Sequence, residues 1–398
     1  MALLEILQHR KAKGQTTYMA FVDIKKAYDK VPIEALQCKL YLVGIWGRAL
    51  EFIRALYEEA SACVQVGGHY STPFEILCGV LQGDPLSPIL FNLFINDLVP
   101  DLKGLGVKIQ RGLGRNVALL FADDLAGLEE TATGMQKLLD KLTQWGDQNE
   151  MTFGLPKCGV MIVNGPDGGH QWKLGAGVIP TVKEYNYLGV PIRDDLDLAP
   201  WVKHKVAKLY GLIDCYRPFL CCHQIPTYYH LMYYCSVVVS QVTYGGEILG
   251  FSKQITKPLN TAVNTGLKLV LGTDSKNSGW ANGPLYKETG SPPIYAGFDY
   301  TRMRALAKFP LLKTPVAKLC RLPPRGQQGS LVKTGLKMRR GLDMSPTRLL
   351  AKSRPGTTNN PELLTKAAKK AFFSKIIAKE AGETKAWKFY EDNGLESS

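Results

Sequence analysis

Three aspartates have the side chains and positions to do chemistry: Asp23 and the adjacent pair Asp123 and Asp124. Asp23 lies near the end of the apolar run YMAFVDI at residues 18–24, and the pair ends a similar run, VALLFADD, at residues 117–124. A carboxylate beside a buried apolar strand is costly unless it is paired or binds a metal. An isolated pair of aspartates is more often a turn that caps a helix, so the metal interpretation needs support from the rest of the chain.

If the two apolar runs are neighbouring strands, their acids converge. Gathered carboxylates suit Mg²⁺, which prefers oxygen ligands and keeps waters and substrate phosphates in its shell. Two such ions about 3.5–4 Å apart can activate an attacking hydroxyl and stabilise a leaving pyrophosphate. The acids therefore indicate phosphoryl transfer, provided that the fold brings them together.

The elements that must position these acids follow from the hydrophobic pattern. The runs at 18–24 and 117–124 are predicted to be buried strands because aromatic and β-branched residues dominate them. Helices are predicted at residues 32–59 with a break at 44–47, at 88–98 and at 135–148. Further strands are predicted at 63–67 and 75–78, joined through GGHYSTP, and at 184–191, which turns at Gly189. This order predicts an α+β sheet with helices on one face.

The chain is predicted to have three domains, at residues 1–192, 193–300 and 301–398. From residue 198 the pattern becomes mainly helical, over 201–215, 228–239 and 255–271, and PPRGQQG at 323–329 predicts a flexible break. No apolar stretch reaches the about 20 residues that cross a bilayer, so no membrane partner is expected. Nine cysteines without a regular framework favour reduced thiols in an intracellular protein.

The positive charge of the chain is concentrated at its C-terminal end. Residues 301–398 contain 21 Lys and Arg but only 7 Asp and Glu, which accounts for the whole net charge of +14. A basic segment beside a neutral core is typical of a protein that binds a polyanion such as nucleic acid. A solvated tail without a partner is an equally good interpretation of the charge alone.

Four strings occur in a fixed order: FVDIKKAYDKV, GVLQGDPLSPILFNLFINDL, LLFADDL and YNYLGV. Together they resemble the reverse transcriptases of non-LTR (LINE-like) retrotransposons, and more distantly those of group II introns. The resemblance runs from about residue 4 to about residue 293. Viral RNA-dependent polymerases usually carry Gly-Asp-Asp where this chain has Ala122, Asp123 and Asp124, so they fit less well.

The resemblance implies a polymerase palm, built from an antiparallel sheet with helices on one face. It also implies a mostly α-helical thumb, which the basic C-terminal extension at residues 301–398 follows in the sequence. In the family, basic residues that grip the triphosphate lie in finger blocks that precede the palm. Those blocks are expected to be largely missing here, and Arg10, Lys11 and Lys13 cannot be assumed to replace them.

The resemblance also implies residue roles at the reaction centre. Asp23, Asp123 and Asp124 match the ligands of two Mg²⁺ ions, for which Mn²⁺ is a possible substitute. Tyr28 falls on the steric-gate position that favours deoxynucleotides, although it could be an ordinary core residue. Lys157 matches a lysine near the leaving pyrophosphate, although a simple surface lysine is as good an interpretation.

Two further motifs match blocks that hold the nucleic acid. Gln82 and Gly83 correspond to a loop under the incoming base and template, where glycine allows close backbone approach and glutamine offers a donor and an acceptor. Tyr187, Leu188 and Gly189 resemble the primer grip, which positions the primer 3′ end. Position matters because phosphoryl transfer depends mainly on alignment and charge stabilisation.

A zinc site is the alternative reading of Cys222, His230 and Cys235, which have the spacing C-x7-H-x4-C. Zinc knuckles of non-LTR elements need another cysteine three positions before the first, where this chain has Phe219. Because the segment is also apolar and aromatic, it is predicted to be a packed thumb helix with buried Cys and His.

The leading functional prediction is an RNA-directed DNA polymerase that uses an RNA template, a DNA primer and dNTPs. The alternative is a truncated, catalytically inactive remnant that still binds nucleic acid. No endonuclease constellation is evident in the sequence. A nuclear location is expected because retrotransposon enzymes act at chromosomes.

Overall fold

The computed structural model describes residues 2–58, 60–109, 114–249, 253–272 and 281–308, together with a few residues between 373 and 380. The chain forms two compact units, Ile6–Leu196 and a second that contains Met1–Glu5 and Asp197–Ser398. The division falls close to the predicted domain boundary after residue 192. Within the described ranges, no helix is long and apolar enough to cross a membrane.

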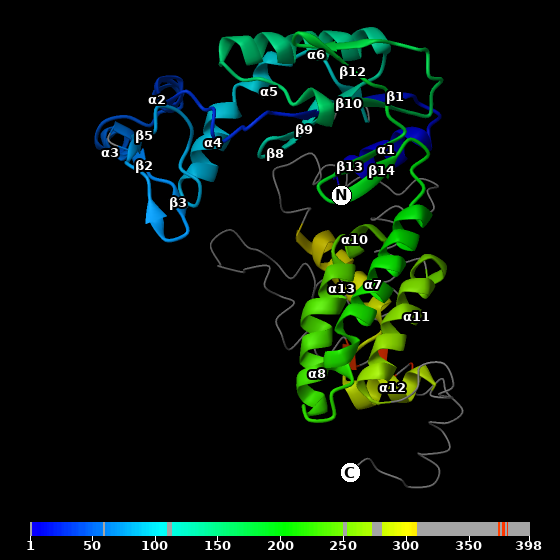
Figure 1. Ribbon diagram of the computed structural model, residues 1–398. Helices are drawn as coiled ribbons and strands as arrows, with labels where there is room; N and C mark the ends of the chain where they lie inside the picture. Colours follow the sequence, from blue (N-terminus) through cyan, green and yellow to red (C-terminus); the bar gives the residue numbers. More distant parts are fainter. Residues whose placement is uncertain are drawn as a thin grey trace, which may run out of the picture. The chain divides into compact units, whose positions relative to one another are not determined.

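The first unit is built on a four-stranded antiparallel sheet with the strand order β10-β1-β9-β8. Its strands are β1 (Thr17–Asp23), β8 (Ala118–Phe121), β9 (Asp124–Glu129) and β10 (Gly159–Val163). Both predicted apolar runs are therefore strands, and they lie in one sheet because β8 turns directly into β9, the partner of β1 (Figure 1). This arrangement confirms the predicted α+β fold.

The two faces of the sheet have different partners, because side chains alternate along a strand. Ala20 and Val22 belong to a core shared with helix α6 (Ala132–Gln148), the predicted helix at 135–148. Phe21 lies between them in sequence and stacks on Tyr185 of strand β13 (Glu184–Tyr187). In Figure 1, α6 and the hairpin of β13 and β14 lie on opposite sides of the sheet. Asp23 continues the alternation of Phe21, so the acid lies on the face opposite α6.

Helices and short hairpins complete the first unit. The helices are α1 (Ala2–Lys11), which belongs to this unit from Ile6 on, α2 (Ile33–Leu42), α3 (Arg48–Glu58), α4 (Ser87–Ile95) and α5 (Leu98–Asp101). The other short strands are β6 (Val107–Lys108), β7 (Arg115–Asn116), β11 (Trp172–Leu174), β12 (Gly177–Ile179) and β14 (Val190–Arg193). The helix predicted at 32–59 is broken at the predicted place, between α2 and α3.

The hairpin predicted from 63–67 and 75–78 needs correction. Two short pairs form instead: β2 (Ser61–Ala62) with β5 (Phe74–Glu75), and β3 (Gln65–Val66) with β4 (His69–Tyr70). The second predicted strand ends early because Gly79 leaves the hairpin and donates its N–H to the carbonyl of Val31, at 2.9 Å. Residues next to Gly79 therefore pair with the segment that follows β1.

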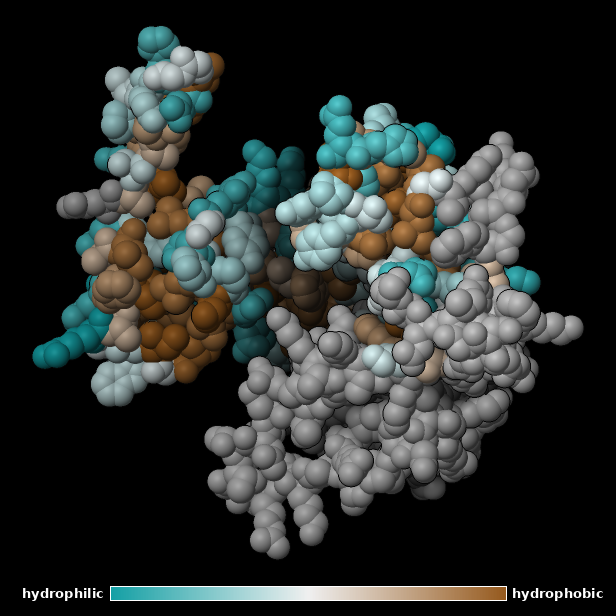
Figure 2. Space-filling model, turned by 90° about the horizontal axis from the view of Figure 1, so that it is seen from below, coloured by the Kyte–Doolittle hydropathy of each residue, from teal (hydrophilic) through white to brown (hydrophobic). Residues whose placement is uncertain are grey.

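The segment from α2 to β5 exposes many large apolar side chains. Trp46 is 70% exposed and Leu42 is 80% exposed, although ordinary surface positions favour polar residues. Other exposed apolar side chains in this segment are Tyr41, Phe52, Val66, Tyr70 and Phe74. Figure 2 shows apolar side chains gathered over this part of the molecule, on the left. This surface contrasts with strands β9 and β10, whose apolar residues are buried.

The second unit is helical in the part that the structure describes, as predicted for the thumb-like region. Its helices are α7 (Ala199–Leu220), α8 (Thr227–Tyr233), the π-helical η2 (Tyr234–Val239), α9 (Ser240–Thr243), α10 (Gly246–Leu249), α11 (Lys253–Val270), α12 (Asn282–Thr289) and α13 (Ile294–Lys308). Leu209 and Ile213 of α7 and Leu259 and Leu267 of α11 are buried. The predicted break at 323–329 lies outside the described residues.

Of the residues considered for zinc, His230 and Cys235 lie in these helices, whereas Cys222 lies in the loop between α7 and α8. The prediction of buried side chains holds for His230 but is wrong for Cys222 and Cys235, which are partly exposed. His230 is 4% exposed, and its ring meets Phe219 edge-on with the centroids 5.2 Å apart. The Sγ of Cys235 lies 3.4 Å from the Oγ of Ser291. Aromatic packing and a thiol contact thus surround the side chains in which a zinc site was considered.

Candidate functional site

Strand register places Asp23 directly opposite Asp124. Asp23 is the last residue of β1, Asp124 is the first residue of β9, and the two are paired across the antiparallel ladder. Ala122 and Asp123 form the turn between β8 and β9, because Phe121 pairs with Asp124. Ala122 has φ +53°, a left-handed conformation that tight hairpin turns require. The adjacent aspartates therefore sit on a strand hairpin and not on a helix cap.

Like charges meet at this turn. The pKa of Asp124 is raised by burial first, then by the negative charges of Asp123 and Asp23, while Lys157 opposes the shift. Lys157 comes from the short helical turn η1 (Leu155–Lys157), and its Nζ lies 3.6 Å from Oδ1 of Asp23. Its side chain is 74% exposed, whereas that of Asp23 is 18% exposed. One solvated lysine is a weak counter-charge for three carboxylates.

The donor set matches Mg²⁺ in chemistry. All three groups offer carboxylate oxygens, and a divalent cation would relieve the repulsion that raises the pKa of Asp124. Among the residues whose positions are described, no three acid, His or Cys side chains converge into a ready-made ion site. The strand register, and not a preformed ion site, is therefore what brings the backbones of Asp23 and Asp124 together.

Tyr28 and Gln82 form a second group. The ring of Tyr28 stacks on Phe91 of α4, with centroids 4.8 Å apart, and its carbonyl accepts the N–H of Val80 at 2.7 Å. Gln82 donates from Nε2 to Oδ1 of Asp29 at 2.6 Å. The loop that holds Gln82 is thus joined to the segment that holds Tyr28, and the sequence reasoning did not find Asp29. The only sequence signal for Asp29 was that it directly follows Tyr28, the residue predicted to be the steric gate.

Gly83 lies in the same loop and is exposed, with φ +89°. This conformation is open to glycine and strained for other residues. Among the described residues other than its two chain neighbours, no atom lies within 4 Å of a Cβ built at Gly83, so the backbone here is accessible beside the Gln82 amide.

The predicted primer-grip residues are the tip of the β13–β14 hairpin. Leu188 and Gly189 have φ values of +51° and +73°, which fits a two-residue turn with both residues left-handed. Tyr187 is buried against Phe21, with ring centroids 5.6 Å apart. Burial and then the nearby Asp124 charge raise the pKa of Tyr187 to about 12. The hairpin is therefore held on the same face as the acids.

Tyr185 adds a contact that the sequence reasoning missed, although it belongs to the same motif. Its ring stacks on Phe21 at 4.0 Å, and its hydroxyl donates to the carbonyl of Lys157 at 2.7 Å. Burial, and then the charges of Cys158, Asp124 and Asp23, raise the pKa of Tyr185 to about 12. Tyr185 thus connects the hairpin to the turn that carries Lys157.

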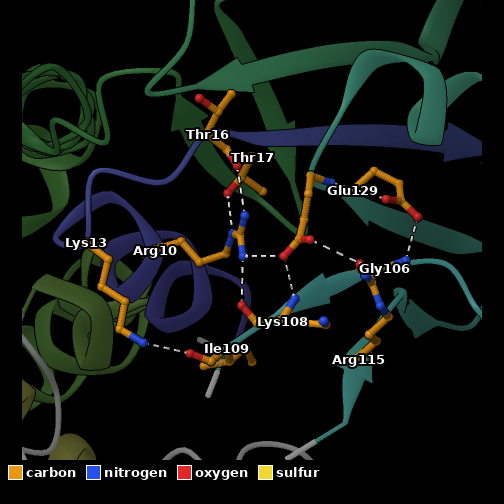
Figure 3. Close-up of polar contacts among 10 residues, drawn as sticks. Arg10, Lys13, Thr16, Thr17, Gly106, Lys108, Ile109, Arg115 and Glu129 are labelled. Atoms are coloured by element: carbon orange, nitrogen blue, oxygen red, sulfur yellow. Dashed lines mark hydrogen bonds and ion pairs between the residues drawn. The ribbon is translucent and has the colours of Figure 1, made fainter. Parts of the chain in front are cut away.

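The basic residues before β1 are engaged within the protein. Arg10 is 2% exposed and donates to Oγ1 of Thr17, the carbonyls of Thr16 and Lys108, and Oε1 of Glu130, at 2.7 to 3.0 Å (Figure 3). Lys13 donates to the carbonyl of Ile109 at 2.8 Å, and Lys11 to that of Asp195. Arg10 therefore anchors the fold and is not available to grip a triphosphate.

The family model described as "Reverse transcriptase (RNA-dependent DNA polymerase)" matches residues 2–192. The chain is 30% identical over 196 residues to the Pol polyprotein of the type-2 retrotransposable element R2DM of Drosophila melanogaster, covering 46% of this chain and 18% of that protein. It is 32% identical over 163 residues to that of the type-1 element R2 of Popillia japonica, covering 40% and 27%. It is 27% identical over 216 residues to the RNA-directed DNA polymerase of the mobile element jockey of Drosophila melanogaster, covering 49% and 22%. The chain thus spans 18 to 27% of the length of these relatives.

Among solved structures, the chain is similar to a telomerase of Candida albicans in complex with a fragment of telomeric RNA. That match has a TM-score of 0.42 and 12% identity and covers 100% of this chain and 52% of the other. The apo telomerase of Candida tropicalis matches with a TM-score of 0.41 and 16% identity, over 91% and 55%. The α+β fold class is assigned from the sheet and helices of this chain and not from these similarities.

Proposed function

We propose that residues 2–192 are a reverse transcriptase domain of the non-LTR retrotransposon type and that the chain is an RNA-directed DNA polymerase. The family model and the relatives that match these residues support the proposal. In this proposal the chain adds dNTPs to the 3′-hydroxyl of a primer on an RNA template. Asp23, Asp123 and Asp124 are the catalytic carboxylates and would hold two Mg²⁺ ions, or Mn²⁺ in their place.

The observation that carries this proposal is the register of β1 and β9. It sets Asp23 opposite Asp124 and beside the turn that holds Asp123. Carboxylates about 100 residues apart in sequence therefore meet at one end of the β1–β9 strand pair. When bound, the two ions would activate the attacking hydroxyl and neutralise the leaving pyrophosphate. The rigid sheet keeps the carboxylates aligned, which phosphoryl transfer requires.

The neighbouring residues bind and orient substrate in this proposal. The Tyr28 ring, held against Phe91, excludes a ribose 2′-hydroxyl, and the amide of Gln82 and the backbone of Gly83 lie under the incoming base. Tyr187, Leu188 and Gly189 position the primer end on the acid face. Lys157, whose ammonium is largely exposed 3.6 Å from Asp23, donates a hydrogen bond or proton to the leaving pyrophosphate.

The partners proposed for the whole chain are an RNA template, a DNA primer and dNTPs, in the nucleus. The helices of the second unit would act as a thumb against the template–primer duplex. Residues 301–398, whose charge surplus equals the net +14 of the chain, would contact phosphates. Most of that segment lies outside the described residues, so this part of the proposal rests on sequence.

Primer extension on an RNA template tests the proposal. Extension by the full chain should require Mg²⁺ or Mn²⁺ and disappear in the variant Asp123→Asn/Asp124→Asn. Asp147→Asn is the matched control, because Asp147 is exposed on α6, the helix on the opposite face of the sheet. Extension that survives in the double variant, or that falls equally in the control, would contradict the proposal.

The basic C-terminal segment supports a second candidate, a nucleic-acid-binding protein without catalysis. In that case RNA binding is salt-sensitive, no dNTP is incorporated, and the aspartate substitutions change nothing. Truncation at Pro323 should flatten the dependence of binding on salt concentration. An unchanged slope would remove the segment from RNA binding in either candidate.

A further inference from the structure

The backbone of Asp23 is held by a turn that lies about 130 residues later in the sequence. The N–H of Gly154 donates to the carbonyl of Asp23 at 2.8 Å, and the N–H of Asp23 donates to Sγ of Cys158 at 3.4 Å. On the next residue pair, Ile24 forms a bridge with Phe153. The segment from Phe153 to Cys158 is thus hydrogen-bonded to the backbone of β1 at Asp23.

The carboxylate itself lies against the same turn. A Cβ added to Gly154 would overlap Oδ2 of Asp23 and lie 3.5 Å from its Cγ. On the other side, Oδ1 is 3.6 Å from Nζ of Lys157. The two carboxylate oxygens of Asp23 therefore have different surroundings. Oδ1 faces Lys157, and Oδ2 occupies the space that a side chain at position 154 would fill.

Backbone conformation does not explain why residue 154 is glycine. Gly154 has φ −82° and ψ 70°, which is close to the inverse γ-turn that residues with side chains adopt readily. Alanine would therefore cost little in backbone strain at this position. The space that the Asp23 carboxylate occupies is the remaining reason, because any Cβ would displace it.

We propose that Gly154 is a positioning residue, which keeps the carboxylate of Asp23 turned so that it can share a divalent cation with Asp124. The proposal rests on the proposed function, since it assumes that the acids bind a cation. In Gly154→Ala, the new methyl group would push the Asp23 carboxylate to another rotamer. The strand register that pairs Asp23 with Asp124 would persist, because the Gly154 N–H bond to the Asp23 carbonyl does not involve the side chain.

Mn²⁺ binding, followed by the electron paramagnetic resonance signal of free Mn²⁺, is the test. Changes to groups that orient a metal ligand typically weaken metal affinity 10–100-fold, so Gly154→Ala should weaken binding about tenfold or more. Gly211→Ala is the matched control. Gly211 lies in helix α7, and an added Cβ there meets nothing within 4 Å. Wild-type affinity in Gly154→Ala would overturn the proposal.

A double-variant cycle separates this effect from general damage to the fold. If the methyl group of Gly154→Ala acts by striking the Asp23 carboxylate, the substitution should lower the Tm of the wild type but not that of Asp23→Ala, where the space is free. An equal loss of Tm in both backgrounds would overturn the proposal. If Gly154→Ala alone fails to fold, recovery of folding in Asp23→Ala/Gly154→Ala supports it, and failure of both contradicts it.

The outcomes also distinguish this proposal from the proposed function. If Asp23→Ala and Asp123→Asn/Asp124→Asn bind Mn²⁺ as the wild type does, the metal site itself is refuted. If those variants lose binding while Gly154→Ala keeps it, only the positioning role of Gly154 is refuted.

Discussion

The two ends of the β1–β9 strand pair differ in how their charged side chains are paired. At one end, where β1 starts and β9 ends, Arg10 is buried and directs its N–H groups to Thr17, Glu130 and backbone carbonyls. At the other end, Asp23 faces Asp124 beside Asp123, and Asp23 forms its ion pair with the exposed Lys157. The same two strands thus carry a compensated charge cluster and an uncompensated one.

The pKa values of Glu130 and Asp124 are shifted in opposite directions at the two ends. Burial alone would raise the pKa of Glu130, but the N–H of Lys108 and the Arg10 guanidinium outweigh it and hold the pKa below its usual range. For Asp124, burial and the neighbouring acids act in the same direction and raise the pKa. Compensated charge stabilises a fold, whereas gathered like charges are retained where chemistry needs them. The comparison therefore predicts a stabilising role for the Arg10 end of the strand pair and, under the proposed function, a catalytic role for the acid end.

The largest expected effect is at the acid end. Asp124→Asn should lower the rate of primer extension by about 10²–10³-fold or more, because it removes a carboxylate that would hold the divalent cations. Its Tm should not fall, since asparagine relieves repulsion from Asp123 and Asp23. Single-turnover extension and thermal unfolding measured together check this. A fall in Tm that accounts for the lost activity would place Asp124 among the structural residues.

At the Arg10 end the expectation is reversed. Arg10→Met leaves the acceptors on Thr16, Thr17 and Lys108 without their buried donor and should cost about 1–3 kcal/mol in the free energy of unfolding. The extension rate per folded molecule should be unchanged. Urea unfolding measures the loss. Arg217→Met is the control, because Arg217 pairs with Asp214 on the surface and should cost less than about 1 kcal/mol. Equal losses in the two variants would remove the contrast.

The pH dependence of stability should have opposite signs at the two ends. Glu130, whose folded pKa lies below its ordinary 4.5, stabilises the fold above that pH and loses this contribution as the pH falls through its folded pKa. Asp124, whose folded pKa lies above its ordinary 3.8, costs stability when ionised, and this cost disappears as the pH falls.

Glu130→Gln should accordingly be less stable than the wild type at pH 7, and Asp124→Asn more stable, with both differences shrinking towards acid pH. Urea unfolding at several pH values, from 7 down to below the ordinary pKa values of 4.5 for Glu130 and 3.8 for Asp124, follows the two differences. If both variants deviate from the wild type in the same direction, the assignment of opposite charge environments is wrong.

The smallest expected change concerns Lys157. Because its charge is the one that lowers the pKa of Asp124, Lys157→Met should move the pH at which extension is half-maximal upwards. The free energy of unfolding should change by less than about 1 kcal/mol, since the pair with Asp23 is solvated. The exposed Lys183 provides the control through Lys183→Met. A pH profile that is the same in both variants would separate Lys157 from the acid cluster.

The sequence contained enough to predict the sheet and its acids, because apolar runs that end in aspartates are local signals. The α2–α3 break and the turn at Leu188 and Gly189 were local as well. Asp29, Tyr185 and Gly154 were not predicted, since each matters through a contact with a residue distant in the sequence. The burial of Arg10 was hidden for the same reason: its acceptors come from β1, β6 and the end of β9.

The roles predicted for Tyr28, Gln82, Gly83, Lys157 and the primer-grip residues stay predictions, because geometry alone does not report on substrate. The hairpin between 61 and 75 was misjudged in its strand lengths, since β-branched composition did not reveal that Gly79 pairs with Val31. The match to the reverse transcriptase family model was predictable because the four motifs keep their order over most of the matched residues.

Anomalous diffraction from crystals soaked in Mn²⁺ tests the central claim most directly, because it locates the ion without relying on activity. The expected result is a peak at the end of the β1–β9 strand pair where Asp23 faces Asp124, roughly 2.0–2.5 Å from carboxylate oxygens of both residues. Full occupancy elsewhere with no peak between these two side chains would contradict the account.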